Sequence, residues 1–109
     1  MKVVINVSHG GFSLSREAVK MLITLVKDKR LKGRLQKSLK EAEKTWGGSV
    51  YPDISRTHPA LVKVVEELGD RAGGRFSKLR VVEIPDDVEW KIEEYDGVEW
   101  VTEKKRRWW

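Results

Sequence analysis

The apolar residues of this chain change their spacing along the sequence, and that change limits the folds open to it. Residues 2–7 are mostly β-branched and apolar and are followed by turn residues, which is typical of a buried strand. Across 18–68 the apolar positions instead recur every three or four residues, as in helices. Strand-like patterns return in 79–103, around the hairpin dipeptide Asp96-Gly97. In 109 residues these patterns predict one α+β domain, 1–109, whose antiparallel sheet includes a C-terminal hairpin and packs against two or three helices.

Capping and helix-breaking residues predict where the helices lie. The first helix is expected to follow a serine cap and to break in the basic stretch 27–32, around Gly33. The third is expected to begin after Thr57, whose hydroxyl would cap it, and to end at Gly69. Between them, a second helix is predicted by a narrow apolar stripe consisting of Leu31, Leu35, Leu39 and Ala42.

The C-terminal strands are expected to form an antiparallel meander that the first strand joins. A two-residue turn in the hairpin would set Glu94 opposite Glu99. Because like charges directly opposite each other are unfavourable, a turn that is longer or shorter by one residue is the alternative.

Charge and composition exclude several classes of protein. Residues 16–44 carry a net charge of +6 and residues 83–103 a net charge of −8. This division favours self-association or a small charged ligand over a nucleic-acid coat, so nucleic acid is not the expected partner. The longest uncharged apolar run, 21–26, is far below the length of about 20 that spans a bilayer, so no membrane is expected. Residues 1–7 are too short for a secretory signal, which predicts a cytosolic location.

Metal and nucleophile chemistry also have little support. With no cysteine and two histidines, the chain lacks disulfides, thiolates and the ligands of a histidine-rich metal cage, so no cofactor is expected. Neither His9 nor His58 stands in a recognised catalytic setting, and no Gly-x-Ser-x-Gly elbow is present. The hairpin carboxylates are expected to form a solvated face. We therefore predict a protein that is not an enzyme.

Three short segments could contact a ligand. Gly10, Gly11 and Phe12 lie between the first strand and the first helix, where open backbone favours a phosphate, or where the glycines only make a tight turn. Arg56 precedes the third helix, whose dipole disfavours a cation, so it requires either a ligand phosphate or a carboxylate of the hairpin. Arg75 and Phe76 could hold a phosphate and stack on a base, unless Phe76 points inward from the following strand.

The basic and aromatic C-terminus forms a fourth candidate. We expect Arg106, Arg107 and Trp108 to end a strand at a subunit interface, where the arginines hold a dianion beside the ligand pocket. Anchoring to a membrane through cationic and aromatic side chains is the alternative.

Three blocks of the chain, in this order, resemble a widespread family of small bacteriophage proteins. The first is Lys2-Val3-Val4-Ile5-Asn6 with Gly10-Gly11-Phe12-Ser13-Leu14-Ser15, the second covers 56–69, and the third covers 83–97 together with Trp108. The chain is similar to the Thoeris anti-defence family of viral sponges, which bind cyclic ADP-ribose isomers, and in some members cyclic oligonucleotides, without cleaving them. It departs from that pattern in having Arg106-Arg107 where the family has a His-Arg pair, and in its unusually basic insert, 27–44.

The resemblance implies a viral protein in the host cytosol that forms dimers, or higher assemblies of dimers, with pockets partly between subunits. Together with the residue patterns it predicts non-enzymatic sequestration of a cyclic nucleotide immune signal. The expected ligand-binding residues are Gly10, Gly11, Phe12, Arg56, Arg75, Phe76, Arg106 and Arg107. The alternative is a phage accessory protein that binds nucleic acid through its basic second helix or inhibits a host protein through its acidic hairpin.

Overall fold

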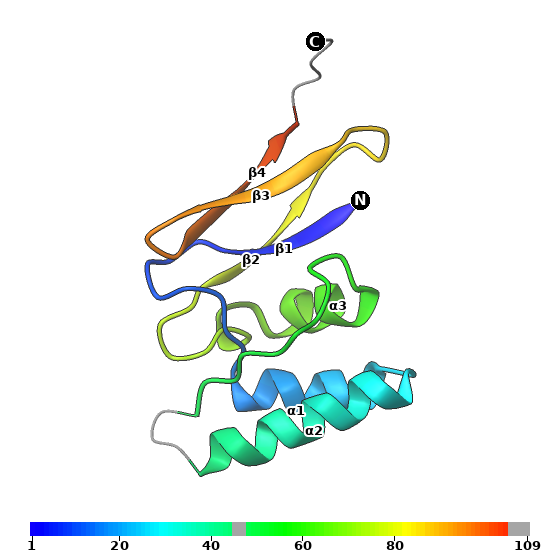
Figure 1. Cartoon of the computed structure of the whole chain (residues 1–109), viewed down its shortest axis with the longest axis vertical. Coiled ribbons are helices and arrows are strands. Elements are labelled where there is room, and N and C mark those ends of the chain that lie inside the picture. Colours follow the sequence, from blue (N-terminus) through cyan, green and yellow to red (C-terminus); the bar gives the residue numbers. More distant parts are fainter. Residues whose placement is uncertain (45–47, 105–109) are drawn as a thin grey trace.

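The structure, a computed structural model, describes residues 1–44 and 48–104 (Figure 1). The predicted α+β class is confirmed: within the described residues, three α-helices accompany two antiparallel two-stranded sheets. The elements in chain order are β1 (Lys2–Asn6), α1 (Arg16–Leu25), α2 (Lys29–Glu43), α3 (Pro59–Leu68), the 3-10 helix η1 (Gly69–Arg71), β2 (Leu79–Glu83), β3 (Trp90–Tyr95) and β4 (Val98–Glu103).

These elements stack in layers along the longest axis of the molecule (Figure 1). α1 and α2 lie side by side at one end, α3 covers one face of the β1-β2 sheet, and the β3-β4 hairpin covers the other face. Successive side chains of a strand point to opposite faces, so β1 contributes side chains both to the α3 face and to the hairpin face of its sheet. Val4 joins the core cluster around α3, whereas Val3 and Ile5 are buried on the hairpin side.

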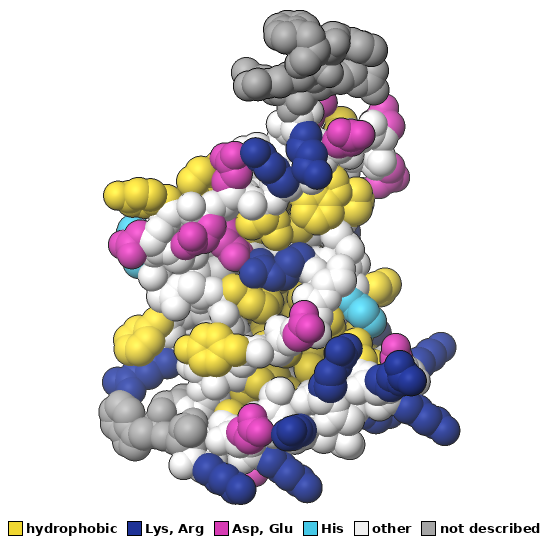
Figure 2. All heavy atoms as spheres, viewed as in Figure 1, with side chains coloured by type: hydrophobic (Ala, Val, Ile, Leu, Met, Phe, Trp, Pro, Cys, Tyr) yellow, Lys and Arg dark blue, Asp and Glu magenta, His cyan; other side chains and the backbone are white. Residues whose placement is uncertain are grey.

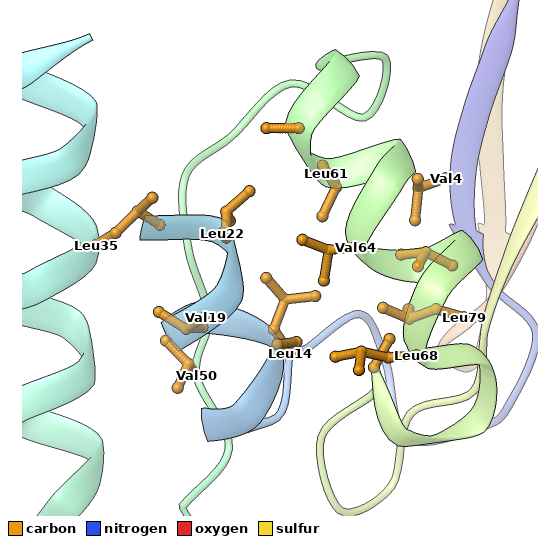
Figure 3. Packing of buried hydrophobic residues seen from close by; sticks show 14 of the residues in the cluster. Val4, Leu14, Val19, Leu22, Leu35, Val50, Leu61, Val64, Leu68 and Leu79 are labelled. Atoms are coloured by element: carbon orange, nitrogen blue, oxygen red, sulfur yellow. The ribbon is translucent and has the colours of Figure 1, made fainter. Parts of the chain in front are cut away.

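The main core lies between the helices and the α3 face of the sheet. α1, α2 and α3 contribute Leu22, Leu35, Leu61 and Val64, and Leu79 of β2 completes the cluster (Figure 3). All five of these side chains are almost inaccessible to solvent. The apolar spacing that predicted the helices therefore marks the faces that pack together.

The helix ends confirm some sequence expectations and correct others. Ser15 caps α1, because its hydroxyl accepts a hydrogen bond from the Ala18 N–H. Gly33 does not break a helix: it lies inside α2, whose start is set by Asp28 accepting hydrogen bonds from two backbone amides. The expected cap of α3 was also wrong, since His58 Nδ1 accepts from the Ala60 N–H at 3.1 Å. The side chain of Thr57 instead bonds to Ser55.

The strands do not form one continuous meander. β1 pairs with β2, β3 pairs with β4, and β2 and β3 belong to different sheets. The connection 84–89, which contains a turn, carries the chain from one layer to the next. The expected hairpin is present, but it stacks on the first sheet instead of extending it.

The hairpin turn has two residues, so the loop is not shifted. Asp96 and Gly97 both have positive φ, 52° and 89°, and Glu94 stands directly opposite Glu99. Each carboxylate has its own partner: Glu94 accepts the Gly97 N–H at 2.6 Å, while Glu99 is buried against Arg56. Because each charge is stabilised by its own donor, the like-charge pairing is tolerated.

Candidate ligand-binding site

Three loops meet at the end of the sheet where β1 leads into α1. They are the loop 7–13, the loop 73–78 before β2, and the β3-β4 turn at 96–97 (Figure 1). Gly10 lies so close to Phe76 that an added Cβ would fall 2.0 Å from the Phe76 carbonyl oxygen. At Gly97 an added Cβ would fall 2.4 Å from the His9 carbonyl oxygen. Glycine is therefore required where these loops touch.

Asn6, at the end of β1, ties the three loops together. Its side-chain amide donates hydrogen bonds of 2.8 Å to the carbonyls of Ser8 and Gly97. Its Oδ1 accepts from the Ser77 hydroxyl at 3.0 Å and from the Lys78 N–H at 2.9 Å. The residue is fully buried, so these bonds replace water that cannot reach it. The loops thus share one rigid support.

Arg56 is held beneath this cluster by an internal carboxylate. Its two terminal nitrogens bind the two oxygens of Glu99 at 2.7 and 2.9 Å, a bidentate pair. Its guanidinium carbon also lies 3.6 Å from the centre of the Phe12 ring. The Asn6 N–H donates to the same Glu99 carboxylate at 2.8 Å. Of the two partners expected for Arg56, the structure thus shows the hairpin carboxylate.

Arg75 and Phe76 stand on the outside of the cluster. The Phe76 side chain is 66% exposed, so it does not point inward, and the Arg75 guanidinium carbon is 5.1 Å from its ring centre. The backbone N–H of Arg75 donates to the Ser49 hydroxyl at 3.0 Å. The neighbouring Gly11 has a φ of 79° and nothing within 4 Å of an added Cβ. An exposed ring, a guanidinium and uncovered backbone therefore occur on adjacent loops.

Six of the predicted site residues lie in this cluster or directly against it. Gly10, Gly11, Arg75 and Phe76 form its outer surface, while Phe12 and Arg56 lie behind it. Arg106, Arg107 and Trp108 lie outside the described residues, and the expectation for the tail stays a prediction. Two clefts, of about 260 and 470 Å³, border the helices, and neither is lined by a predicted site residue.

Sequence reasoning missed the two residues that organise the cluster. Asn6 was part of the first strand pattern, and Glu99 was counted with a solvated acidic face, yet its side chain is only 8% exposed. The one available signal for Glu99 was Arg56, whose position before a helix required an anionic partner. Within 1–44 and 48–104, no group of three or more histidine and carboxylate side chains is placed to hold a metal ion.

Comparisons of the chain with protein-family models, curated proteins and solved structures found no match. Among the described residues, no helix has the length and apolar content needed to cross a membrane.

Proposed function

We propose that this protein binds and sequesters a cyclic nucleotide signal, a cyclic ADP-ribose isomer or a cyclic oligonucleotide, without chemical turnover, as a viral anti-defence protein of the host cytosol. The observation that carries the proposal is the exposed Arg75-Phe76 pair beside Gly10 and Gly11. An arginine pairs with phosphate, an aromatic face stacks on a base, and glycine backbone allows close approach. The resemblance of 2–15, 56–69 and 83–97 to the Thoeris sponges supports the same ligand class.

The rigidity of the loop cluster supports tight binding. Sequestering a scarce signal needs micromolar affinity or better, which is a binding free energy of about −8 kcal/mol. A site that is already ordered loses less conformational entropy on binding, and Asn6 orders all three loops before any ligand arrives. Arg56 has a supporting part in this proposal: it holds Phe12 and Glu99 in place beneath the surface that contacts the ligand.

We also propose that the protein acts as a homo-oligomer joined through the β3-β4 hairpin. The strand register places Trp90, Ile92 and Val101 on the same face as the buried Glu99, which packs on the first sheet. Tyr95, Val98 and Trp100 lie on the opposite, outer face, where the rings of Tyr95 and Trp100 are exposed. A second copy would cover this outer face of a hairpin that is marginally stable by itself.

A binding and release experiment tests the ligand. The protein is incubated with cyclic ADP-ribose isomers and cyclic di- and trinucleotides, separated from free ligand, denatured by heat, and the released compounds are identified by chromatography. Intact ligand in stoichiometric amount is the expected result. Altered ligand would indicate an enzyme, and the absence of binding to any compound in the panel would contradict the proposal.

Matched variants locate the binding surface. Arg75→Ala and Phe76→Ala should each weaken binding by about tenfold or more, because each removes a phosphate pair or a stacked base. The controls are Arg71→Ala and Tyr51→Ala, which remove an exposed guanidinium and an exposed ring elsewhere. Calorimetry should show unchanged affinity for both controls. Equal losses in the variants and the controls would place the ligand elsewhere.

A further inference from the structure

α2 has two faces of opposite chemistry. Its inner face is buried through Leu31, Leu35 and Ala42. On the opposite side, the helical period gathers exposed basic residues into one outward surface, the basic face, which consists of Lys29, Arg30, Arg34, Lys37, Lys40 and the C-cap Lys44. In Figure 2 most of the visible basic side chains lie at the α1-α2 end of the molecule, away from the acidic hairpin.

The cations of the basic face have no ion-pair partner in the part of the chain that the structure describes. None of its six cations forms an ion pair with any residue of 1–44 or 48–104. Glu41, four residues after Lys37 on the same helix, is not paired with it. Six like charges on one helix repel one another and are stabilised when an external anion is present.

Gly33 lies in the middle of the basic face, one turn from both Lys29 and Lys37. A Cβ added at this position would meet no atom within 4 Å, so packing within the chain does not require a glycine. Glycine inside a helix makes the helix less stable than alanine would. Its presence at Gly33 therefore points to a role other than stability. A partner can approach the helix backbone more closely at a glycine than at a residue with a side chain.

We propose that the basic face of α2 binds the sugar-phosphate backbone of duplex nucleic acid without reading its sequence. The 15-residue helix is about 22 Å long, a length over which a duplex presents many phosphate charges. α2 contains no aromatic residue, whereas proteins that bind single strands use aromatic rings to stack on unpaired bases. This surface shares no side chain with the proposed cyclic nucleotide site, which consists of residues in the loops 7–13 and 73–78.

The acidic hairpin of a second copy is a weaker partner for the same face. Two hairpin carboxylates already have partners, since Glu99 pairs with Arg56 and Glu93 with Lys91, and in the connection before the hairpin Asp86 pairs with the amino terminus. The division of the sequence into a basic and an acidic segment did not favour nucleic acid, because the charges of a segment do not show which of its cations have ion-pair partners in the folded chain. Within the described residues other cations, among them Lys20, Lys63 and Lys78, also lack an ion pair, but α2 gathers six such cations on one helix.

Fluorescence anisotropy with a labelled 20-base-pair DNA duplex of mixed sequence tests the proposal on the full chain. The dissociation constant should be 100 μM or lower at 50 mM salt, as is usual for binding of this kind at about 10⁻⁴ to 10⁻⁶ M. The logarithm of the binding constant should fall with the logarithm of salt concentration with a slope of about −3.5 to −5.5, if four to six phosphates are contacted.

Two triple variants with the same change in net charge separate the basic face from general electrostatics. Lys29→Gln/Lys37→Gln/Lys40→Gln should bind at least about tenfold more weakly and lower the salt slope by about 2 to 3. Lys78→Gln/Lys91→Gln/Lys104→Gln, on the sheet side, should change affinity by less than about threefold. Glutamine is a good helix former, and circular dichroism should show the helices intact in both variants.

Three outcomes would overturn the proposal. The first is a duplex dissociation constant above 100 μM at 50 mM salt, and the second is an equal loss of affinity in the two triple variants. The third is a wild-type protein that forms an oligomer but does not bind the duplex, together with an α2 triple variant that sediments as a smaller species. The basic face would then contact a second copy of the chain. None of these measurements uses the cyclic nucleotide, so their failure is distinct from failure of the proposed sequestration.

Discussion

Asn6 is the single side chain on which the loop cluster depends. In Asn6→Asp the two side-chain N–H donors are replaced by an oxygen that faces the carbonyls of Ser8 and Gly97. We expect the free energy of unfolding to fall by about 2 to 4 kcal/mol, because the new oxygen of the buried carboxylate has no donor and two carbonyls lose theirs. Only the other oxygen keeps the Ser77 and Lys78 donors. Urea denaturation followed by circular dichroism measures the change.

The matched control for this prediction is Gln36→Glu, the same amide-to-carboxylate change at an exposed position of α2. It should change the free energy of unfolding by no more than about 0.5 kcal/mol. Similar losses in the two variants would mean that Asn6 does not hold the loops together.

The Arg56-Glu99 pair is the second prediction at this scale. Arg56→Met leaves a carboxylate that is only 8% exposed without its guanidinium, and the cost should be about 3 to 5 kcal/mol. Adding Glu99→Gln removes the unpaired charge while keeping an oxygen to accept the Asn6 N–H, so the double variant should recover part of that loss. A double-mutant cycle by urea denaturation should give a coupling energy of at least about 1 kcal/mol, and strict additivity would refute the pairing.

The local requirement for a partner of Arg56 could be predicted, but the identity of that partner could not. A cation before a helix needs an anion, and this is visible in the sequence around the residue itself. Glu99 lies 43 residues away and Asn6 lies 93 residues from Glu99, and no periodicity relates such positions. Contacts of this kind exist only after the strands and loops have been brought together.

At the scale of secondary-structure elements, Gly33 offers a test inside α2. Gly33→Ala should raise the free energy of unfolding by about 0.5 to 1 kcal/mol, because alanine loses less backbone entropy in a helix and the added Cβ meets nothing. The midpoint of urea denaturation measures this gain. A loss of stability would show that the position is more crowded than the structure indicates.

Gly97, in the β3-β4 turn, should respond in the opposite direction. It has a φ of 89°, and a Cβ there would lie 2.4 Å from the His9 carbonyl oxygen. Gly97→Ala should therefore lower the free energy of unfolding by at least about 1 to 2 kcal/mol, measured in the same way. Because both changes are Gly→Ala, Gly33→Ala serves as its control, and a stabilising effect at Gly97 would contradict the close contact between the turn and the loop after β1.

The elements also show which parts of a fold can be predicted from sequence alone. α1, α2, α3 and the hairpin were predicted because their apolar spacing, caps and turn residues are local. The division into two sheets was not predicted, because strand partners are set by packing between layers. β2 resembles the next strand of a meander in sequence, yet it pairs only with β1, since α3 covers one face of that pair and the hairpin the other.

At the scale of the whole molecule, charge is distributed by layer. The basic face of α2 lies at one end and the acidic hairpin at the other, with the neutral core between them (Figure 2). The loops that carry the proposed cyclic nucleotide surface lie between these ends, and Arg75 there contacts Ser49, in the segment that follows α2. The proposed duplex surface lies on α2 itself, so the two surfaces use different side chains.

The last prediction concerns assembly through the hairpin. Tyr95 is 75% exposed and Trp100 is 41% exposed, and exposed aromatic rings on a marginal two-stranded sheet are typical of an interface. Sedimentation equilibrium should give the mass of a dimer or a multiple of it, and Tyr95→Ser/Trp100→Ser should shift the mass toward that of the 12.6 kDa chain. Tyr51→Ser, which removes a ring that is 72% exposed on the loop beside α2, should leave the mass unchanged. A wild-type chain that sediments as a monomer at all concentrations would refute this interface, because the apolar side chains of the hairpin would then be stable in water.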